Sequence, residues 1–416
     1  MRPLALSLAC IGAAAPPAWG QINATSIAGF PMVGNVVAGV ATGAFPNANT
    51  LQINQATQRA IINWNGFSLT GGNTVFFNQP GAGSVTLNRV VTANAPSEIF
   101  GTLTAPGHVF IINPAGVLFG AGSQVNVGGL VASTLDVDTD AFAGGDRAKT
   151  PLTGSGKLAF TRTEADTGKI TVESGATITA APGGTVALMG QEVSNAGQIN
   201  VAQGSVGLLS GLGATLDFAG DGLTNFKIDT AAAKALVTQL GQITADGGRV
   251  NLAALSTDAS ALVVNQQGLI QARSLESRNG QIVLGGGGNN EVRVSGTLDA
   301  SGTAAKVGGG SVQLTGGAVR IEGASIDASG TEGGTIVAVA GGVMMSPASS
   351  LKADGSTGKG GIIAVVGLNS SHADGIFSAA GASDGGGIAF GGKSIEVGEG
   401  TNVNAAGGSG ANGKWV

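Results

Sequence analysis

Apolar and polar residues alternate along most of the chain in a phrase that recurs from about residue 170. Each copy holds an apolar residue, a small or polar pair, a glycine-rich corner and an alternating apolar stretch. Three examples are ATITAAPGGTVALMG from residue 176, GQITADGGRVNLAAL from 241 and ASIDASGTEGGTIVAVAGG from 324. Copies 25 to 28 residues apart align on Ile270, Leu298, Ile326, Leu351, Ile376 and Val403, and Ile178 and Ile199 are 21 apart.

Short strands repeating at such a period are the signature of a solenoid. The phrase has no helical periodicity, which argues against leucine-rich and ankyrin-type repeats. The pattern therefore predicts an all-β parallel β-helix, in which each copy forms one coil about 4.8 Å from the next. Inward Ile, Val and Leu would stack in ladders, and glycine would form the corners. At that spacing we expect roughly sixteen coils and a rod of about 75 Å.

Several segments interrupt the pattern. Residues 133–169 are the most acidic region and predict an excursion from the rod. Residues 230–240 and 256–268 predict short helices packed on its side. The chain stops at GGSGANGKWV (407–416), where no polar cap follows as solenoids normally require. We therefore expect the sequence to be a fragment of a longer protein.

Composition supports the strand-rich prediction. Of the 416 residues 74 are Gly, 43% are hydrophobic and 11% are charged, which excludes a disordered chain. The net charge is −5 and there is no basic run, so nothing favours nucleic acid or an anionic membrane surface as a partner.

The first twenty residues predict a secretory signal peptide. Arg2 precedes the apolar run 4–15, and Ala18 and Gly20 predict cleavage before Gln21. A lipid anchor on Cys10 is disfavoured because the residues before it match that signal poorly. Since Cys10 is the only cysteine, we expect a mature chain without disulfides. No later run reaches the roughly 18 apolar residues of a membrane-spanning helix.

Three motif matches arise from glycine frequency. GIAFGGKS (387–394) fits the phosphate-loop pattern, but the strand-like SIEVGEG follows it where a helix is needed. GASDG (381–385) and GSGANG (408–413) likewise lack the context of a nucleophile elbow or a dinucleotide site.

Metal and acid–base chemistry are also disfavoured. The two histidines, His108 and His372, cannot build a zinc site without cysteine. Asp299 and Asp327, from the DASG repeats, should stack at one corner and bond to its backbone rather than to a metal. Acidic residues are scattered, so we predict no catalytic residue, no cofactor and no enzyme.

The stretch VFIINPAGVLFG (109–120) predicts two strands joined at a corner. Asn113 at the first position, Pro114 at the second and Gly116 at the fourth are preferences of a type I turn. Ala115 at the third position disfavours type II, which needs a positive φ there.

Residues 21–135 resemble the secretion domain of filamentous haemagglutinin-like exoproteins of the two-partner secretion pathway. The segments that carry the resemblance are INWNGFSL (62–69), NTVFFNQPGAGSVTLNRV (73–90), SEIFGTLTAPGHVFIINPAGVLFG (97–120) and SQVNVGGLVAST (123–134). GGTVALMGQEVSNAGQINVAQG (183–204) resembles the start of the same family's repeats.

The resemblance implies a right-handed β-helix with an N-terminal cap, exported through a dedicated outer-membrane barrel transporter. Periplasmic domains of the transporter would recognise the N-terminal domain, and the product would reach the extracellular space or the cell surface. The domains expected are a signal peptide (1–20), a secretion-domain core (21–135, extending to about 260), an acidic excursion (136–169) and β-helical repeats (170–416).

The family carries an Asn-Pro-Asn-Gly motif, which Asn113, Pro114, Ala115 and Gly116 match except at Ala115. The resemblance makes these four the candidate secretion motif. A second matching region supplies further candidates for transporter recognition or folding: Phe77, Asn78, Gln79, Pro80, Asn88 and Arg89. Arg89 would pair with Glu98 or touch the transporter.

Adhesion to host cells or other bacteria, through surface receptors, is the predicted use of the rod. Alternatives are the N-terminal part of a contact-dependent toxin, a small-ligand scavenger and, more remotely, a β-helical carbohydrate-active enzyme. A longer reading frame would separate them, since more repeats favour an adhesin and a charged, non-repetitive end favours a toxin.

Overall fold

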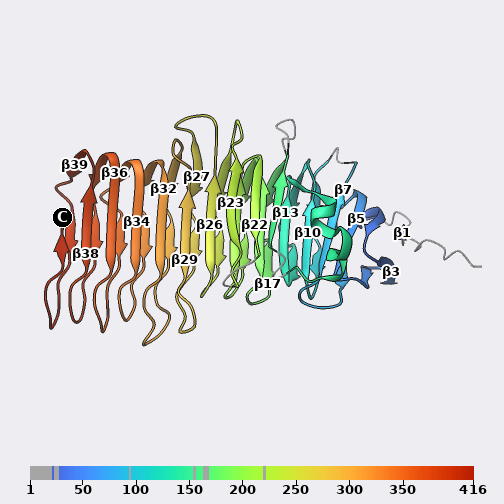
Figure 1. Cartoon of the computed structure of the whole chain (residues 1–416), viewed down its shortest axis with the longest axis horizontal. Helices are drawn as coiled ribbons and strands as arrows, with labels where there is room; N and C mark the ends of the chain where they lie inside the picture. The colour runs from blue at the N-terminus through green and yellow to red at the C-terminus, as the bar shows by residue number, and fades with distance from the viewer. Residues whose placement is uncertain (1–20, 23–27, 93–94, 153–155, 163–167, 219–221) are drawn as a thin grey trace, which may run out of the picture.

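A computed structural model describes residues 21–22, 28–92, 95–152, 156–162, 168–218 and 222–416. The predicted signal peptide and Cys10 lie outside the described residues. The chain winds into a long parallel β-helix, confirming the predicted all-β fold, and Figure 1 shows its strands in order along the rod. Each coil contributes strands to three parallel stacks, which we call sheet B and faces 1 and 2 of sheet A.

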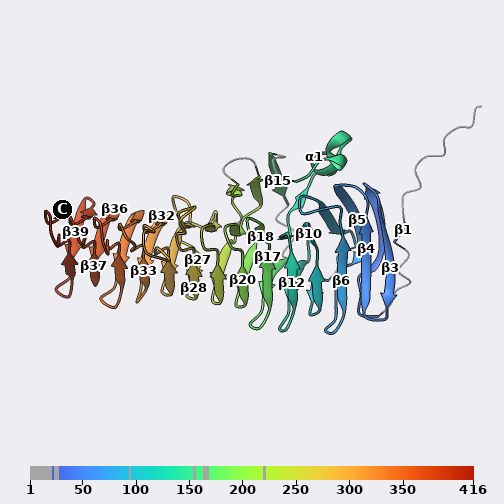
Figure 2. The ribbon, with the colours of Figure 1, turned by 90° about the horizontal axis from the view of Figure 1, so that it is seen from below.

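Sheet B lines one side of the rod with short strands, side by side in Figure 2. Its members are β3 (Ala41–Asn47), β4 (Thr50–Gln55), β6 (Thr74–Asn78), β9 (Thr102–Thr104), β12 (Gln124–Val127), β17 (Thr177–Ala180), β20 (Gln198–Asn200), β25 (Gln242–Thr244), β28 (Leu269–Gln271), β31 (Thr297–Asp299), β33 (Ser325–Asp327), β35 (Ser350–Lys352), β37 (Ile376–Ser378) and β40 (Asn402–Asn404). All neighbours in this sheet pair in parallel except β3 and β4.

Sheet A supplies the other two stacks. Face 1 contains β5 (Arg59–Gly66), β7 (Val85–Val90), β10 (His108–Ile112), β13 (Gly129–Ser133), β18 (Thr185–Gly190), β21 (Ser205–Ser210), β26 (Arg249–Ala254), β29 (Gln281–Gly285), β32 (Ser311–Ile321), β34 (Thr335–Met345), β36 (Ile362–Ala373), β38 (Gly387–Gly391) and β41 (Lys414–Trp415). Face 2 contains β8 (Ser97–Ile99), β11 (Gly116–Phe119), β16 (Lys169–Val172), β19 (Glu192–Asn195), β24 (Leu236–Gln239), β27 (Leu262–Gln266), β30 (Glu291–Val294) and β39 (Ser394–Val397). The long strands β32, β34 and β36 cross both faces.

The N-terminal end is capped by antiparallel pairing. β2 (Met32–Ala38) pairs with both β1 (Gln21–Ile22) and β5, and β3 folds back on β4. This cap satisfies backbone groups that an open coil would expose. The cap and the excursions use residues outside the coils, so sheet B has fewer rungs than the sixteen coils expected.

The core is a set of stacked ladders set by register. In sheet B, an inward apolar side chain on each strand from β4 to β37 lies directly above its neighbour. The members of this ladder, all fully buried, are Leu51, Val75, Leu103, Val125, Ile178, Ile199, Ile243, Ile270, Leu298, Ile326, Leu351 and Phe377. Burying each side chain stabilises the fold by roughly 1.5–3 kcal/mol relative to exposure.

Small residues let the later coils turn tightly. Buried alanines occupy the first corner position after the sheet B strand in successive coils, at Ala245, Ala272, Ala300, Ala328, Ala353 and Ala379. Glycine is required beside them, because a Cβ on Gly360 would lie 1.9 Å from the carbonyl oxygen of Ala379. Asp299 and Asp327 accept hydrogen bonds from the backbone N–H groups of Ser301 (3.0 Å) and Ser329 (2.8 Å), as predicted.

A second hydrophobic core lies outside the β-helix, over face 1. Two segments leave the coils to form it, and both carry strands of a four-stranded antiparallel sheet: β14 (Asp136–Val137), β15 (Lys157–Thr161), β22 (Gly213–Asp217) and β23 (Asn225–Thr230). The first segment also holds α1 (Thr139–Ala143) and the 3-10 helix η1 (Gly145–Lys149). Phe142, Phe160 and Leu216 pack against outward apolar side chains of face 1 such as Phe110.

Two predictions about the rod are wrong. Residues 230–240 and 256–268 contain β24 and β27 instead of helices, because Val237 and Val264 occupy one core ladder of face 2. Ile376 is not a core position. It is exposed, and Phe377 takes the rung above Leu351.

Candidate secretion site

The corner at residues 113–116 is a hydrogen-bonded β-turn between β10 and β11. The N–H of Gly116 donates to the carbonyl of Asn113 at 2.9 Å, as the predicted turn requires. Gly116 has φ +116°, and a Cβ there would lie 2.6 Å from the carbonyl oxygen of Lys169 in the next coil. Both facts restrict this position to glycine.

Asn113 holds the turn from inside. Its side chain is buried, its Oδ1 accepts from the N–H of Ala115 at 2.9 Å, and its Nδ2 donates to the Ala95 carbonyl (3.1 Å) and the Ser97 hydroxyl (3.0 Å). The Asn113 amide therefore joins the turn to the chain entering β8. A buried polar side chain costs the fold little stability when its donors and acceptors are hydrogen-bonded in this way.

Pro114 and Ala115 form the outer edge of the turn and are partly exposed. Ala115, the one residue that differs from the family's Asn-Pro-Asn-Gly motif, therefore lies at the surface. An asparagine side chain at this position could reach a partner or solvent. The turn itself forms without that amide.

Half of the second candidate region is buried inside the coils. Phe77 is buried beside the sheet B ladder, in register with Ile53 of β4. Asn88 accepts from the Trp64 indole N–H at 3.0 Å and donates to the Phe110 carbonyl at 3.1 Å. Gln79 donates to the Thr86 hydroxyl at 2.8 Å. These contacts tie three successive coils together.

The remaining residues of that region differ in exposure. Asn78 is exposed and donates to Asn54 Oδ1 at 2.9 Å, and Pro80 is exposed at the corner. Arg89 does not pair with Glu98. Its guanidinium instead contacts Asp136 at 3.0 Å and the Val137 carbonyl at 2.6 Å, anchoring the first extra-helical segment.

Gln79 of the second candidate region lies at the opposite end of β10 from the turn at 113–116. Gln79 also donates to the carbonyl of His108, the first residue of β10, whereas Asn113 follows the last residue of that strand. The strand's five residues separate them by about 16 Å. The structure therefore places Arg89, whose register partner is Ile112, beside the turn at 113–116. Gln79 lies away from this turn.

Arg59 is a buried anchor of the first extra-helical segment that the sequence pattern did not suggest. It is 1% exposed and donates to three backbone carbonyls, those of Phe142 (2.8 Å), Pro151 (2.9 Å) and Thr150 (3.0 Å). Burial and then the charge of Arg147 lower its pKa. The only signal in the sequence is that Arg59 is the first residue of the otherwise uncharged stretch RAIINWNG.

His108 is a second buried group in this region. Burial lowers the pKa of its imidazole to about 4, so the side chain is neutral at physiological pH. Within the described ranges, no group of three or more His, Cys, Asp or Glu side chains could hold a metal ion. Among the same residues, no helix is both long enough and apolar enough to cross a membrane.

The capped β-helix with extra-helical segments defines the class of secretion domains that precede β-helical exoproteins. Residues 38–300 match the TPS secretion domain family, and the chain belongs to that family. Its fold is similar to the HMW1 secretion domain from Haemophilus influenzae, with TM-score 0.75, 27% identity, and coverage of 92% of this chain and 100% of that one. Proteins with this domain are secreted through the periplasm to the extracellular space or the cell surface, and the domain implies an outer-membrane transporter as partner.

Two curated relatives are named heme/hemopexin-binding protein. The protein from Haemophilus influenzae strain Rd is 30% identical over 263 residues, which cover 62% of this chain and 27% of the relative. The second, also from Haemophilus influenzae, is 38% identical over 109 residues, which cover 26% of this chain and 12% of the relative. The chain thus spans about a quarter or less of the relatives it matches.

Proposed function

We propose that this chain is the secretion-competent, N-terminal part of a surface-presented adhesin that works by binding rather than by catalysis. The match of residues 38–300 to a secretion domain carries the proposal, together with the regular rod that follows it. A rod of stacked coils extends binding surfaces away from the cell and repeats them, which favours multivalent attachment. Its partners would be the barrel transporter during export and receptors on host or bacterial cells afterwards.

Within this proposal, the turn at residues 113–116 acts mainly in folding. Asn113 is buried and fully paired, so its removal would unfold the junction between β10 and β11 rather than remove a contact surface. The exposed Asn78 and Pro80 and the partly exposed Pro114 and Ala115 are the side chains of both regions that remain available to the transporter.

Export tests the proposal directly. The chain would be expressed in a Gram-negative host with and without its transporter, and folded β-rich protein would be measured in the medium. We expect protein in the medium only when the transporter is present. Equal amounts in both cultures would refute two-partner export of this chain.

Ligand scavenging is the second candidate, because both curated relatives are named for binding heme and hemopexin. The matched regions cover only part of each relative, so the binding segment of those proteins can lie outside them. Titration of the purified chain with heme, followed by the Soret band, separates the candidates. Saturable binding would favour scavenging, and its absence would leave adhesion as the proposal.

A further inference from the structure

The outward surface of sheet B carries an uncharged array over seven successive strands, β4 to β25. Two outward positions per strand stack in register along the rod. The array consists of Thr50, Gln52, Thr74, Phe76, Thr102, Thr104, Gln124, Asn126, Thr177, Thr179, Gln198, Asn200, Gln242 and Thr244. Every member except Phe76 is Thr, Gln or Asn, and none is buried.

The middle of the array alternates strictly. Hydroxyl pairs lie on β9 and β17, and amide pairs lie on β12 and β20, as in TLT, QVN, TIT and QIN. A hydroxyl rung thus recurs every two coils, or about 10 Å. The two columns are about 7 Å apart and the whole array is about 29 Å long, so it is a narrow strip parallel to the rod axis.

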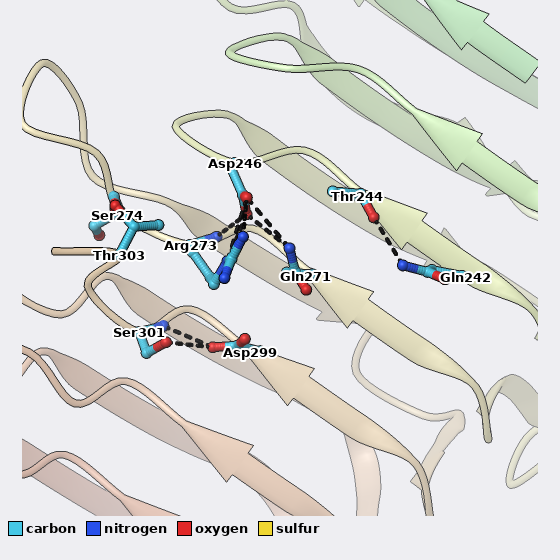
Figure 3. A network of polar contacts seen from close by, with 9 residues as sticks. All are labelled: Gln242, Thr244, Asp246, Gln271, Arg273, Ser274, Asp299, Ser301 and Thr303. Atoms are coloured by element: carbon cyan, nitrogen blue, oxygen red, sulfur yellow. Dashed lines mark hydrogen bonds and ion pairs between the residues drawn. The ribbon is translucent and has the colours of Figure 1, made fainter.

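Most polar side chains of this strip are available for binding, although Gln52 donates to the Asn54 side chain at 2.6 Å. Among the described residues, the eight side chains on β9, β12, β17 and β20 make no hydrogen bond to another residue. At the end of the strip, Gln242 donates to Thr244 at 3.2 Å (Figure 3). Hydroxyls and amides both donate and accept, so the strip offers two-way hydrogen bonding along its length.

The strip contains no charged residue, whereas the surfaces around it do. The same coils carry the ion pair of Lys169 and Glu192 on face 2. Beyond the strip, Arg273 and Asp246 form an ion pair at 2.6 Å on the next corner (Figure 3). Farther along the same column lie Asp299 and Lys352.

We propose that this strip binds a neutral, extended β-linked polysaccharide lying along the rod axis. A slender chain of hydroxyl-bearing sugars matches the strip in shape, in absence of charge and in two-way hydrogen bonding, and its two-sugar unit is comparable in length to the two-coil repeat. A globular protein partner fits poorly, since stable protein interfaces bury about 800 Å² on each side, several times the area of this strip. The inference deepens the proposed adhesin by naming the class of its ligand.

Affinity electrophoresis of the purified chain tests the inference. Hydroxyethyl cellulose is the neutral probe, and carboxymethyl cellulose is the matched probe with the same backbone and added carboxylates. We expect retardation by the neutral polymer and weaker retardation by the charged one. No retardation by hydroxyethyl cellulose, or stronger retardation by carboxymethyl cellulose, would overturn the proposal.

Variants locate the binding. Changing Thr102, Thr104, Thr177 and Thr179 to Val removes four hydroxyls while keeping β-branched side chains that suit a strand, and should weaken binding at least tenfold. The control Thr297→Val with Ser325→Ala alters one of these columns outside the strip and should bind normally. If the four-residue variant keeps its circular dichroism spectrum and binds like the wild type, the strip is not the site.

A second variant and a second measurement distinguish polysaccharide binding from self-association of the chain. Gln124→Lys with Gln198→Lys adds two charges to the strip and should also abolish retardation by the neutral polymer. Sedimentation equilibrium would show whether the strip instead pairs two copies of the chain. A dimer dissociated by these lysines would overturn the polysaccharide assignment. Because binding is measured on purified protein, failure here leaves the export result untouched.

Discussion

Acid should destabilise the secretion domain through His108. The imidazole has a usual pKa of 6.5, which burial lowers to about 4 in the folded chain. Between these values the unfolded chain takes up a proton that the folded chain does not, so stability falls as pH falls from 6.5 towards 4. Above pH 6.5 both states are neutral at this site and stability does not depend on it. The difference amounts to about 2.5 kcal/mol at pH 4.5 and about 3.4 kcal/mol below pH 4.

Urea unfolding monitored by Trp64 fluorescence measures this effect. Trp64 is fully buried on β5, which pairs with β7, and β7 pairs with the strand of His108. His108→Gln removes the titrating group and serves as the control, since both proteins keep the same carboxylates. The stability difference between wild type and variant should shift by about 2.5 kcal/mol between pH 7.5 and 4.5. A difference that stays constant over this range would refute the assigned burial of the imidazole.

Three further substitutions test the contacts described above. Asn113→Ala should cost about 3 kcal/mol, because it leaves buried turn partners unpaired, and should lower export in proportion; an unchanged urea midpoint would contradict this. Arg59→Met should release the first extra-helical segment, seen as faster cleavage of that segment in limited proteolysis, whereas a pattern identical to wild type would count against the anchor. Gly360→Ala should lower the melting temperature, because its Cβ would meet the Ala379 carbonyl at 1.9 Å, and Gly387→Ala, which has open space around it, should not; equal effects would exclude the close approach.

The sequence predicted the features that depend on local pattern. The rung from Ile178 to Ile199 and the turn at residues 113–116 are confirmed because period-two alternation and turn preferences are local properties. The corner bonds of Asp299 and Asp327 are confirmed for the same reason, since each reaches only two residues along the chain.

Contacts between coils could not be predicted in this way. Arg89 finds Asp136, 47 residues away, only because a second core places the excursion over face 1. Phe377 rather than Ile376 stacks on Leu351 of the preceding coil, and the buried Ala379 lies on the same inward side two residues later. The alanine-rich segment 230–240 suits a helix locally, but its valine is required by a ladder that neighbouring coils create.

The second core would also affect how the domain folds during export. Outward apolar side chains on β5, β7 and β10 belong to this core, in which Phe110 packs on Phe142 and Phe160 of the first extra-helical segment, 32 and 50 positions later. A chain that emerges N-terminus first would expose this surface until the first extra-helical segment has crossed the membrane. The early coils would therefore lack their outer cover until that segment docks, and its docking would oppose their return to the periplasm.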